Sequence, residues 1–470
     1  MSESQALFTV LRQSADPAAA AAIERLVNEA PDPELSRINV LDFAVRHNLD
    51  EERAIAAFLH GARLGLFELS WNVLCPGCSG VLDSNATLKS VHQEDYSCAL
   101  CAAGYEPTLD EMVEVAFTVS PRVRRIAAHE PGALPFWEYM RQIFWSSGIE
   151  LPAGQAFDRL IEEVVVDSVE LPPGEKAILS MQLPAQFCIV FDPVTHSAQF
   201  LDVKGEPTRE RQGFTVVFNN LHAPTGTVEM RPGPLRLVLE NRTDMRVLPA
   251  VWIAGQALHD LLGKRKSFLT AKRLLSNQTF RDIYGTDTLD VDQRLKITSL
   301  TFLFTDLKGS TELYERVGDL VAYDMVRAHF RVLHEVVASE AGAVVKTIGD
   351  ALMATFPTPD RAVAAALKMR EAMRVLNAES KHDDLLVKIG IHEGSCLAVT
   401  LNDRLDYFGQ TVNIAARVQG LAVSRSIFAT ESVVANTQSA QLLDARGLTP
   451  LPRQAMLRGI ADELTVYEIP

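Results

Sequence analysis

Hydrophobic and polar residues change their spacing several times along the chain, and each change marks a predicted region. Residues 16 to 70 have helical spacing in short segments, one of which begins after Asn48, a candidate N-cap. Residues 113 to 251 carry short apolar runs punctuated by Pro, Gly and Asn, which predict strands, with a helical insert around residues 135 to 148. From Leu295 onward, predicted strands and helices alternate in the order βαββαβ, the arrangement of ferredoxin-like folds.

Four of the six cysteines form two C-x-x-C pairs that nineteen residues separate, Cys75 with Cys78 and Cys98 with Cys101. This spacing is typical of two knuckles that close a tetrahedral thiolate site, so we predict a zinc-ribbon-like segment. Four thiolates leave no open coordination position, which favours a structural Zn²⁺. Four unrelated reduced thiols and a redox-active dithiol are the alternatives.

These patterns together predict a multidomain α+β protein. The predicted regions are a helical, winged-helix-like segment (1–70), a zinc-ribbon-like segment (71–105), an antiparallel β-sandwich of regulatory character (106–253), a helical linker (254–294) and a ferredoxin-like domain (295–470).

Charge limits the partners that we expect for the 470 residues. With 45 basic and 60 acidic residues the net charge is −15, which opposes non-specific binding to DNA or anionic lipid. Because the winged-helix-like segment also lacks a basic face, we expect no nucleic-acid contact. Neither an uncharged apolar run of membrane-spanning length nor a signal peptide is evident, and we expect a cytoplasmic protein.

Two carboxylates stand out in the C-terminal region. Asp306 ends the first predicted strand in F-T-D-L-K-G-S-T, and Asp350 lies in the predicted hairpin V-K-T-I-G-D-A-L between two central strands. In this topology the two positions lie side by side, so the pair can hold divalent cations next to a turn whose amides suit phosphate. Asn413 and Arg417 lie four residues apart in a third motif, on one face of a predicted helix.

The motifs F-T-D-L-K-G-S-T, V-K-T-I-G-D, G-I-H-E-G, D-Y-F-G-Q-T-V-N-I-A-A-R and L-R-G resemble the catalytic domain of class III nucleotidyl cyclases. The resemblance covers about residues 295 to 469. It implies two Mg²⁺ or Mn²⁺ ions per active site, on Asp306, Asp350 and the carbonyl of Leu307. It also implies that Asn413 orients the ribose and that Arg417 stabilises the transition state.

The same resemblance assigns the substrate-binding residues, which are Lys346, Asp406, Arg458, Lys308, Gly309, Ser310 and Thr311. Lys346 and Asp406 match the positions that read the purine. A lysine donates and an aspartate accepts, which complements N1 and N6 of adenine and mismatches guanine. We therefore expect an adenylate cyclase that converts ATP to cyclic AMP and pyrophosphate. Arg458 stands where mammalian members of the family have lysine, and it keeps the charge.

Family members build each active site from two subunits, so the resemblance implies a head-to-tail homodimer with two shared sites. A guanylate cyclase is the nearest alternative, and a non-catalytic regulator or binding protein is the alternative from another class. The intact set of metal and transition-state residues argues against the regulator. The first 290 residues predict a regulatory region that binds an unknown ligand or protein, which the sequence does not identify.

Overall fold

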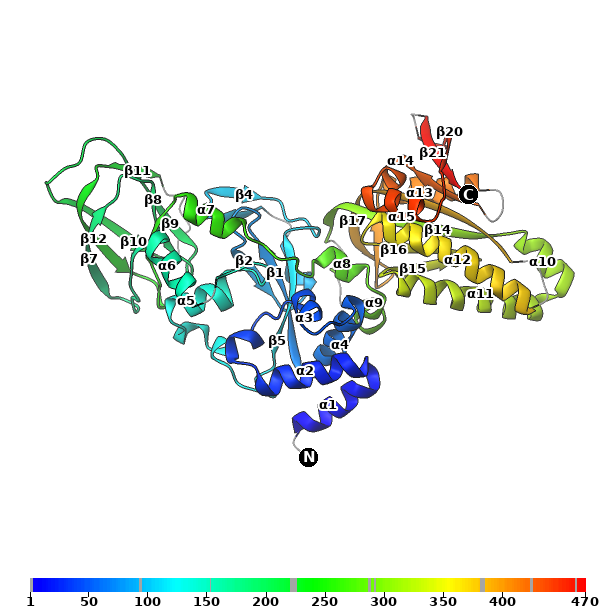
Figure 1. Ribbon diagram of the computed structural model, residues 1–470, viewed down its shortest axis with the longest axis horizontal. Coiled ribbons are helices and arrows are strands. Elements are labelled where there is room, and N and C mark those ends of the chain that lie inside the picture. The colour runs from blue at the N-terminus through cyan, green and yellow to red at the C-terminus, as the bar shows by residue number, and fades with distance from the viewer. Residues whose placement is uncertain are drawn as a thin grey trace. The chain divides into compact units, whose positions relative to one another are not determined.

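The computed structural model describes residues 3–92, 95–152, 154–219, 226–285, 289–290, 293–380, 385–422, 426–460 and 463–470. The chain forms two compact units (Figure 1). The first consists of Met1–Ala86, Glu94–Pro107 and Met112–Leu269, and the second of Thr87–Gln93, Thr108–Glu111 and Thr270–Pro470. The backbone therefore passes from one unit to the other five times, and the predicted linker (254–294) divides between them.

Helices open the first unit, as the spacing predicts. They are α1 (Glu3–Ser14), α2 (Pro17–Glu29), α3 (Val40–Arg46) and α4 (Glu51–Leu64). The Asp16 side chain caps α2 by accepting the N–H groups of Ala18 and Ala19, each at 3.0 Å. Helix α4 begins after Asp50, whose carboxylate accepts the N–H of Arg53, so Asn48 is not the cap that we expected.

A three-stranded sheet follows these helices. Its strands are β1 (Phe67–Leu74), β2 (Val81–Asn85) and β5 (Val113–Val119), in the order β2-β1-β5. The strand 113–119, which we expected within the sandwich, therefore belongs to a separate sheet. Short elements complete this part of the unit: 3₁₀ helices at Asp32–Leu35, Ala127–His129 and Pro131–Ala133, the hairpin β3 (Tyr96–Cys98) and β4 (Ala103–Tyr105), α5 (Phe136–Tyr139) and a π-helical turn at Met140–Phe144.

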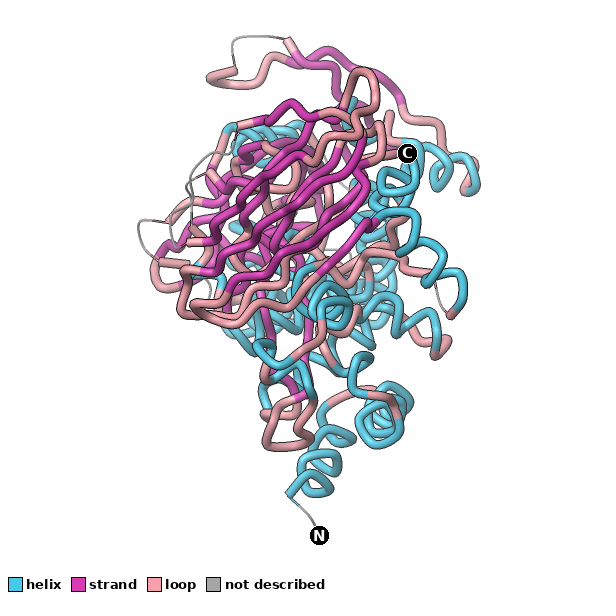
Figure 2. The backbone as a smooth tube through the Cα atoms, turned by 90° about the vertical axis from the view of Figure 1, so that its left-hand side faces the viewer, coloured by secondary structure: helices cyan, strands magenta, loops and turns pink. Residues whose placement is uncertain are grey.

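Two further sheets form the rest of the first unit, and Figure 2 turns this end of it toward the viewer. One has the order β10-β12-β7, and the other β11-β9-β8-β13-β6. Their bounds are β6 (Val165–Ser168), β7 (Lys176–Leu183), β8 (Cys188–Asp192), β9 (Ser197–Val203), β10 (Gln212–Phe218), β11 (Thr227–Met230), β12 (Gly233–Asn241) and β13 (Ala250–Ile253), with helices α6 (Gln155–Val164) and α7 (Gln256–Gly263).

The two sheets share one hydrophobic core, to which Val190 and Val251 contribute from one sheet and Leu237 and Phe218 from the other. The predicted antiparallel pairing is wrong at two places, because β10 pairs with β12 and β11 with β9 in parallel. Alternation of apolar residues predicts a strand and its buried face, but it does not distinguish the direction of the partner strand.

The second unit has an eight-stranded sheet whose main order is β15-β16-β14-β17-β19-β21-β20, with β18 on β17. Its strands are β14 (Leu295–Lys308), β15 (Ala343–Ile348), β16 (Ala351–Phe356), β17 (Leu386–Leu401), β18 (Arg404–Phe408), β19 (Ile427–Thr430), β20 (Leu451–Ala455) and β21 (Leu464–Ile469). Within it, β15-β16-β14-β17 is the strand order of a ferredoxin-like βαββαβ unit, which confirms that prediction. Strand β15 lies at the edge of the sheet, so the hairpin of Asp350 does not join two central strands.

Helices cover both faces of this sheet. Helices α11 (Asp319–Ser339) and α12 (Pro359–Ser380) lie side by side (Figure 1) and pack on one face through a core that includes Leu333, Met369 and Leu303. Helix α13 (Gln410–Leu421) does not join this core. It packs in a separate hydrophobic cluster with Phe428 and Val466. The other helices are α8 (Ala271–Leu275), α9 (Gln278–Tyr284), α10 (Ser310–Val317), α14 (Glu431–Val434) and α15 (Thr437–Ala445), with a 3₁₀ turn at Leu88–Ser90.

Candidate active site

Strand pairing places the two predicted metal-binding carboxylates at neighbouring positions. Asp306 lies near the end of β14, and the ladder between β14 and β16 pairs Thr305 with Leu352. One step further along this register brings Asp306 next to Ala351, the residue after Asp350. Gly349, with φ 64°, makes the tight turn that presents Asp350.

The two carboxylates have donor chemistry that fits a hard divalent cation. One oxygen of Asp350, Oδ2, is buried without a hydrogen-bond partner among the described residues, an arrangement that costs free energy unless a cation approaches. Asp306 Oδ2 lies 3.5 Å from Nζ of Lys388. The Leu307 side chain is buried in the core beneath, so only its backbone carbonyl is available as a further ligand.

The turn after Asp306 leads directly into α10. Lys308 is exposed, and Gly309 adopts the left-handed conformation, with φ 73°, at the position before the helix. Helix α10 begins at Ser310, so the first N–H groups of the helix follow the carboxylate. The side chains of Ser310 and Thr311 lie outside the described residues.

Lys346 and Asp406, the predicted purine-reading residues, contact one another. Lys346 extends from β15 and donates through Nζ to Oδ2 of Asp406 in β18. The other oxygen of Asp406 accepts the N–H of Tyr407 at 2.8 Å. The Asp406 side chain is 10% exposed and that of Lys346 42%, so a nearly buried acceptor faces a partly exposed donor.

Helix α13 carries Asn413 and Arg417, and two glycines of β17 determine how closely it approaches the sheet. A Cβ on Gly390 would lie 2.1 Å from the backbone nitrogen of Gln419, and a Cβ on Gly394 2.9 Å from Oγ1 of Thr411. These are the two glycines of the motif G-I-H-E-G. Only residues without a side chain allow this contact between helix and strand.

The guanidinium group of Arg417 lies against the segment that contains Arg458. A Cβ on Gly459, whose φ is 75°, would meet both terminal nitrogens of Arg417 at 3.4 Å. The fold therefore brings the helix and the L-R-G segment together. Asn413 is exposed four residues before Arg417, at the start of the helix.

Sequence reasoning missed Lys388, which lies directly opposite Asp306 in the ladder between β14 and β17. The signal was present in the sequence, because Lys388 precedes Gly390, the first glycine of G-I-H-E-G, by two residues. In a strand, residues two apart lie on the same face, so Lys388 and Gly390 share one face of the sheet. Between these glycines, burial lowers the pKa of His392 to about 4, and its Nδ1 contacts Oγ1 of Thr430 at 2.8 Å. His392 is therefore a packing residue.

The predicted site residues thus form separate sets within one chain. Across the described residues, neither Asp306 nor Asp350 has a hydrogen bond or ion pair with Lys346, Asp406 or Arg417.

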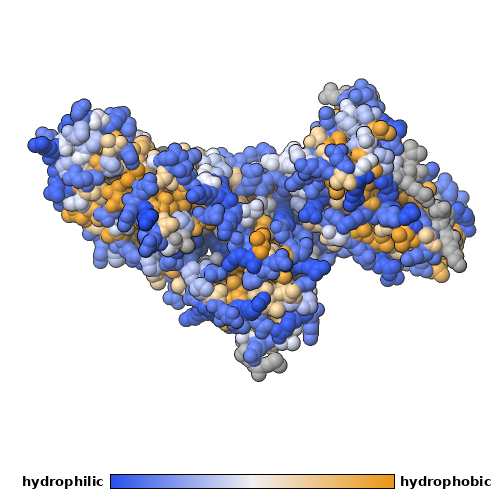
Figure 3. All heavy atoms as spheres, in the orientation of Figure 1, coloured by the Kyte–Doolittle hydropathy of each residue, from blue (hydrophilic) through white to orange (hydrophobic). Residues whose placement is uncertain are grey.

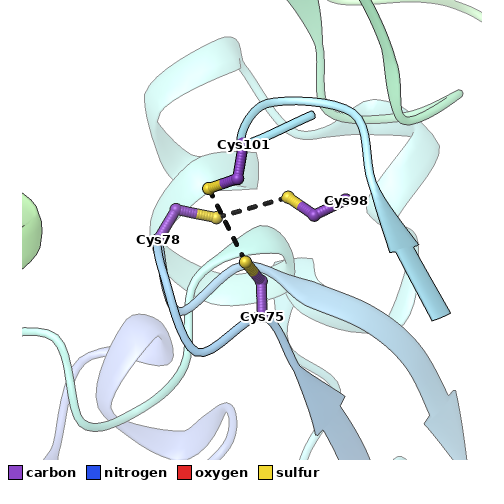
Figure 4. A group of neighbouring side chains, drawn as sticks. All are labelled: Cys75, Cys78, Cys98 and Cys101. Carbon is purple, nitrogen blue, oxygen red and sulfur yellow. Dashed lines mark hydrogen bonds between the residues drawn. The ribbon is translucent and has the colours of Figure 1, made fainter. Parts of the chain in front are cut away.

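The four predicted cysteine ligands converge in the first unit. Cys75 and Cys78 lie in the loop after β1, and Cys98 and Cys101 belong to the hairpin β3–β4, with all four sulfurs directed at one another (Figure 4). The sulfurs lie within 4.8 Å of one another, and two pairs are 3.6 Å apart. Tetrahedral Zn²⁺ with bonds of about 2.3 Å requires sulfur separations of about 3.8 Å, so the donor set fits zinc.

A cavity of about 840 Å³ lies in the first unit near these cysteines. The hairpin β3–β4, the turn between β8 and β9, and β10 line it. Among the residues that the structure describes, its lining includes Asp95 and His196. The volume is typical of small-molecule sites.

The comparisons with known protein families divide the chain near the boundary between the two units of the structure. Residues 1–282 match the model of a family of unknown function (DUF5939), and residues 293–460 match the model of the adenylate and guanylate cyclase catalytic domain. The chain belongs to the family of unknown function, and its C-terminal region is a class III adenylate/guanylate cyclase catalytic domain.

Curated relatives match about a quarter to a third of this chain. Adenylate cyclase 2 of Rhizobium meliloti is 34% identical over 132 residues, which cover 26% of this chain and 36% of the relative. An adenylate cyclase of Anabaena cylindrica is 28% identical over 185 residues, covering 36% of each chain, and one of Mycosarcoma maydis 31% over 170 residues, covering 32% and 7%. The chain thus spans about a third or less of the length of these relatives.

Solved structures of both adenylyl and guanylyl cyclases are among the similar proteins. The adenylyl cyclase CyaB from P. aeruginosa is 21% identical, with a TM-score of 0.34 over 38% of this chain and 96% of that one. The guanylyl cyclase Cya2 is 22% identical, with a TM-score of 0.32 over 38% and 92%. Separately, none of the helices in the described part of the chain has the length and apolar character needed to span a bilayer.

Proposed function

We propose that this protein is an adenylate cyclase, which converts ATP to 3′,5′-cyclic AMP and pyrophosphate. The pairing of Lys346 with Asp406 carries the choice of ATP, because it presents one donor and one acceptor at the position expected for the purine. Adenine offers the complementary acceptor and donor, whereas guanine offers the reverse. The named relatives support the same choice.

Asp306 and Asp350, with the Leu307 carbonyl, would hold two Mg²⁺ or Mn²⁺ ions. When bound, these ions would increase the acidity of the ATP 3′-hydroxyl and neutralise charge on the phosphates. Lys388 lies where it can contact the phosphates once a cation replaces it beside Asp306. The N–H groups at the start of α10 would donate hydrogen bonds to the phosphate oxygens from the other side.

Arg417 and Arg458 would supply positive charge at the α-phosphate while the 3′-hydroxyl attacks in line and pyrophosphate leaves. Asn413, one turn before Arg417, would hold the ribose so that its hydroxyl points at the phosphorus. The positions of Asn413 and Arg417 depend on the close contact that α13 makes with β17 at Gly390 and Gly394.

The active sites would be shared in a head-to-tail homodimer. Large apolar side chains are exposed next to the site residues: Ile348 (52%) lies between Lys346 and Asp350, and Phe408 (67%) follows Asp406 by two residues. Figure 3 shows further hydrophobic residues on the second unit. A second copy of the chain would cover such residues and bring its own carboxylates to the purine-reading set.

Complementation between two inactive variants tests this arrangement. In a shared site, Asp306→Asn and Arg417→Ala damage opposite halves, so a mixed dimer keeps one intact site. Co-expression in equal amounts gives half mixed dimers, and we expect about a quarter of wild-type activity. Co-expression that yields no more activity than either variant alone contradicts shared sites, and Asp306→Asn co-expressed with Asp350→Asn is the matched control that must stay inactive.

The cysteine cluster would hold a structural Zn²⁺, since its four donors leave no position for substrate. The first unit would regulate the cyclase, and the cavity of about 840 Å³ offers room for a small-molecule effector. A comparison of full chain with a fragment starting near residue 292 tests regulation, because equal specific activities contradict it.

A further inference from the structure

Two short segments on either side of the cysteine hairpin belong to the cyclase unit. Residues 87–93 precede β3, and residues 108–111 follow β4, yet both segments fold with the second unit. The hairpin between them, with Cys98 and Cys101, folds with the first. Four of the five backbone crossings between the units therefore lie within 26 residues of sequence, on either side of two metal-binding cysteines.

The segment 108–111 bonds to β14, an interior strand of the cyclase sheet. The ladder between β14 and β17 is interrupted between Ile297 and Leu300, which leaves the N–H groups of Thr298 and Ser299 outside it. Asp110 accepts both, at 2.5 and 3.3 Å, and pairs with Nζ of Lys272 at 3.2 Å.

Asp110 is itself buried, with 9% of its surface exposed, so these bonds are protected from water. Backbone bonds extend the attachment: the N–H of Leu109 donates to the carbonyl of Lys296 at 3.0 Å, and the N–H of Lys272 donates to the carbonyl of Leu109 at 2.8 Å.

The segment 87–93 is attached in a comparable way. The side-chain amide of Gln293 donates to the carbonyls of Leu88 and Val91, at 3.2 and 2.7 Å. Both of these residues are almost fully buried. The two attachments lie at the start of β14, the strand that ends with Asp306 and whose register sets Asp306 opposite Lys388.

The hairpin between the two segments has few backbone bonds of its own. Strands β3 and β4 form a two-stranded sheet with three residue pairs, which is too small to be stable by itself in water. Cys98 and Leu100 are also buried in a hydrophobic core of the first unit, and a metal on the four cysteines would add free energy that holds the hairpin there. Without it, residues 87–111 would become a longer loop, and holding both segments in the cyclase unit would cost more conformational entropy.

We propose that metal occupancy of the four-cysteine centre controls the cyclase unit through residues 87–93 and 108–111, with Zn²⁺ as the metal. This inference rests on the proposed cyclase function. Asp110 is a positioning residue: it holds the start of β14 rather than touching substrate. Loss of zinc would loosen the Asp110 contacts, allow the β14 register to fluctuate and lower the rate of cyclisation.

The test measures zinc content, hydrogen exchange and turnover on the purified full chain. Zinc is released with a strong chelator, which leaves the Cys396 thiol opposite Ile297 unmodified, and restored with excess Zn²⁺. We expect release to speed amide exchange of Thr298 and Ser299 by about 10-fold or more, since each loses a bond to a charged acceptor. Activity should fall and return on reloading, with exchange in β12 unchanged. Unchanged exchange at 298–299 in zinc-free protein overturns the proposal.

Asp110→Asn keeps the test decisive if the zinc-free protein unfolds more widely. This variant should retain zinc and lose the protection of at least one of Thr298 and Ser299, because an amide accepts through only one of its two polar atoms. It should also lower kcat with little change in KM and respond less to zinc release than wild type. Asp202→Asn in the sandwich is the matched control and should behave as wild type. An Asp110→Asn variant with wild-type exchange and turnover overturns the proposal. The exchange readout needs no turnover, so an inactive wild-type chain contradicts only the proposed function.

Discussion

Replacing Asp406 with Asn tests the choice of purine most specifically. The two side chains have the same shape, but the amide can accept through only one of its two polar atoms. In the structure both carboxylate oxygens are occupied, one by the N–H of Tyr407 and the other by Nζ of Lys346. The side-chain NH₂ group of the variant must therefore face one of these two donors, the Tyr407 N–H or Lys346 Nζ. Toward the purine, the variant presents an NH₂ donor to the N6 amine of adenine, which is also a donor.

The magnitude follows from burial of the carboxylate. Because the Asp406 side chain is only 10% exposed, water does not replace the lost acceptor. A hydrogen bond to a charged group contributes roughly 1.5–3 kcal/mol, so kcat/KM for ATP should fall by about 30-fold for a loss of about 2 kcal/mol. For GTP, whose purine oxygen accepts at the same place, kcat/KM should stay level or rise.

The assay compares turnover of ATP and GTP by wild type and by the variant, with the same divalent cation. Asp403→Asn is the matched control, because Asp403 is exposed in the turn before β18 and its φ of 58° suits asparagine equally well. The control should keep the wild-type preference. If Asp406→Asn also keeps it, Asp406 does not read the base, and the argument for ATP fails.

Three further predictions concern the second unit. Asp350→Asn should lower activity by about 1,000-fold or more at saturating Mg²⁺ without lowering the melting temperature, whereas the same change at Asp319, an exposed acid at the start of α11, should be near neutral. Gly390→Ala should push α13 from β17 and remove most activity, while Gly420→Ala, with open space around it, should not; equal activity of both variants would refute the close-contact argument. Burial lowers the pKa of both His329 and His392 to about 4, below the unfolded value of about 6.5. The unfolded chain therefore binds more protons between these values, so stability present above about pH 6.5 should be lost as the pH falls toward 4, and His392→Gln should show a smaller loss in thermal melts than wild type.

Some features of the fold could be predicted because a local pattern determines them. The 3-4 spacing of apolar residues in α11 and α12 and the largely apolar run in β14 correspond to helices and to a strand buried on both faces. The two C-x-x-C pairs converge as expected, because a knuckle is a local turn. The helix cap shows the limit of such patterns, since Asn48 and Asp50 have similar capping chemistry and tertiary packing determines which one is used.

Other features depend on contacts between residues far apart in sequence. No local signal shows that Asp110 would bond to a strand 188 residues later, because an isolated aspartate suits a turn equally well. The alternation of apolar and polar residues likewise does not indicate that β10 pairs with β12 in parallel. Asp306 and Asp350 could be placed together only because the βαββαβ order fixes which strands are neighbours.

Turnover by the purified full chain tests the central claim most directly. The chain is incubated with ATP or GTP and with Mg²⁺ or Mn²⁺, and cyclic nucleotide and pyrophosphate are quantified beside the Asp306→Asn variant. We predict cyclic AMP and pyrophosphate in equal amounts from wild type, a clear preference for ATP, and neither product from the variant. Cyclic GMP as the main product, or equal activity of the variant, would contradict the account.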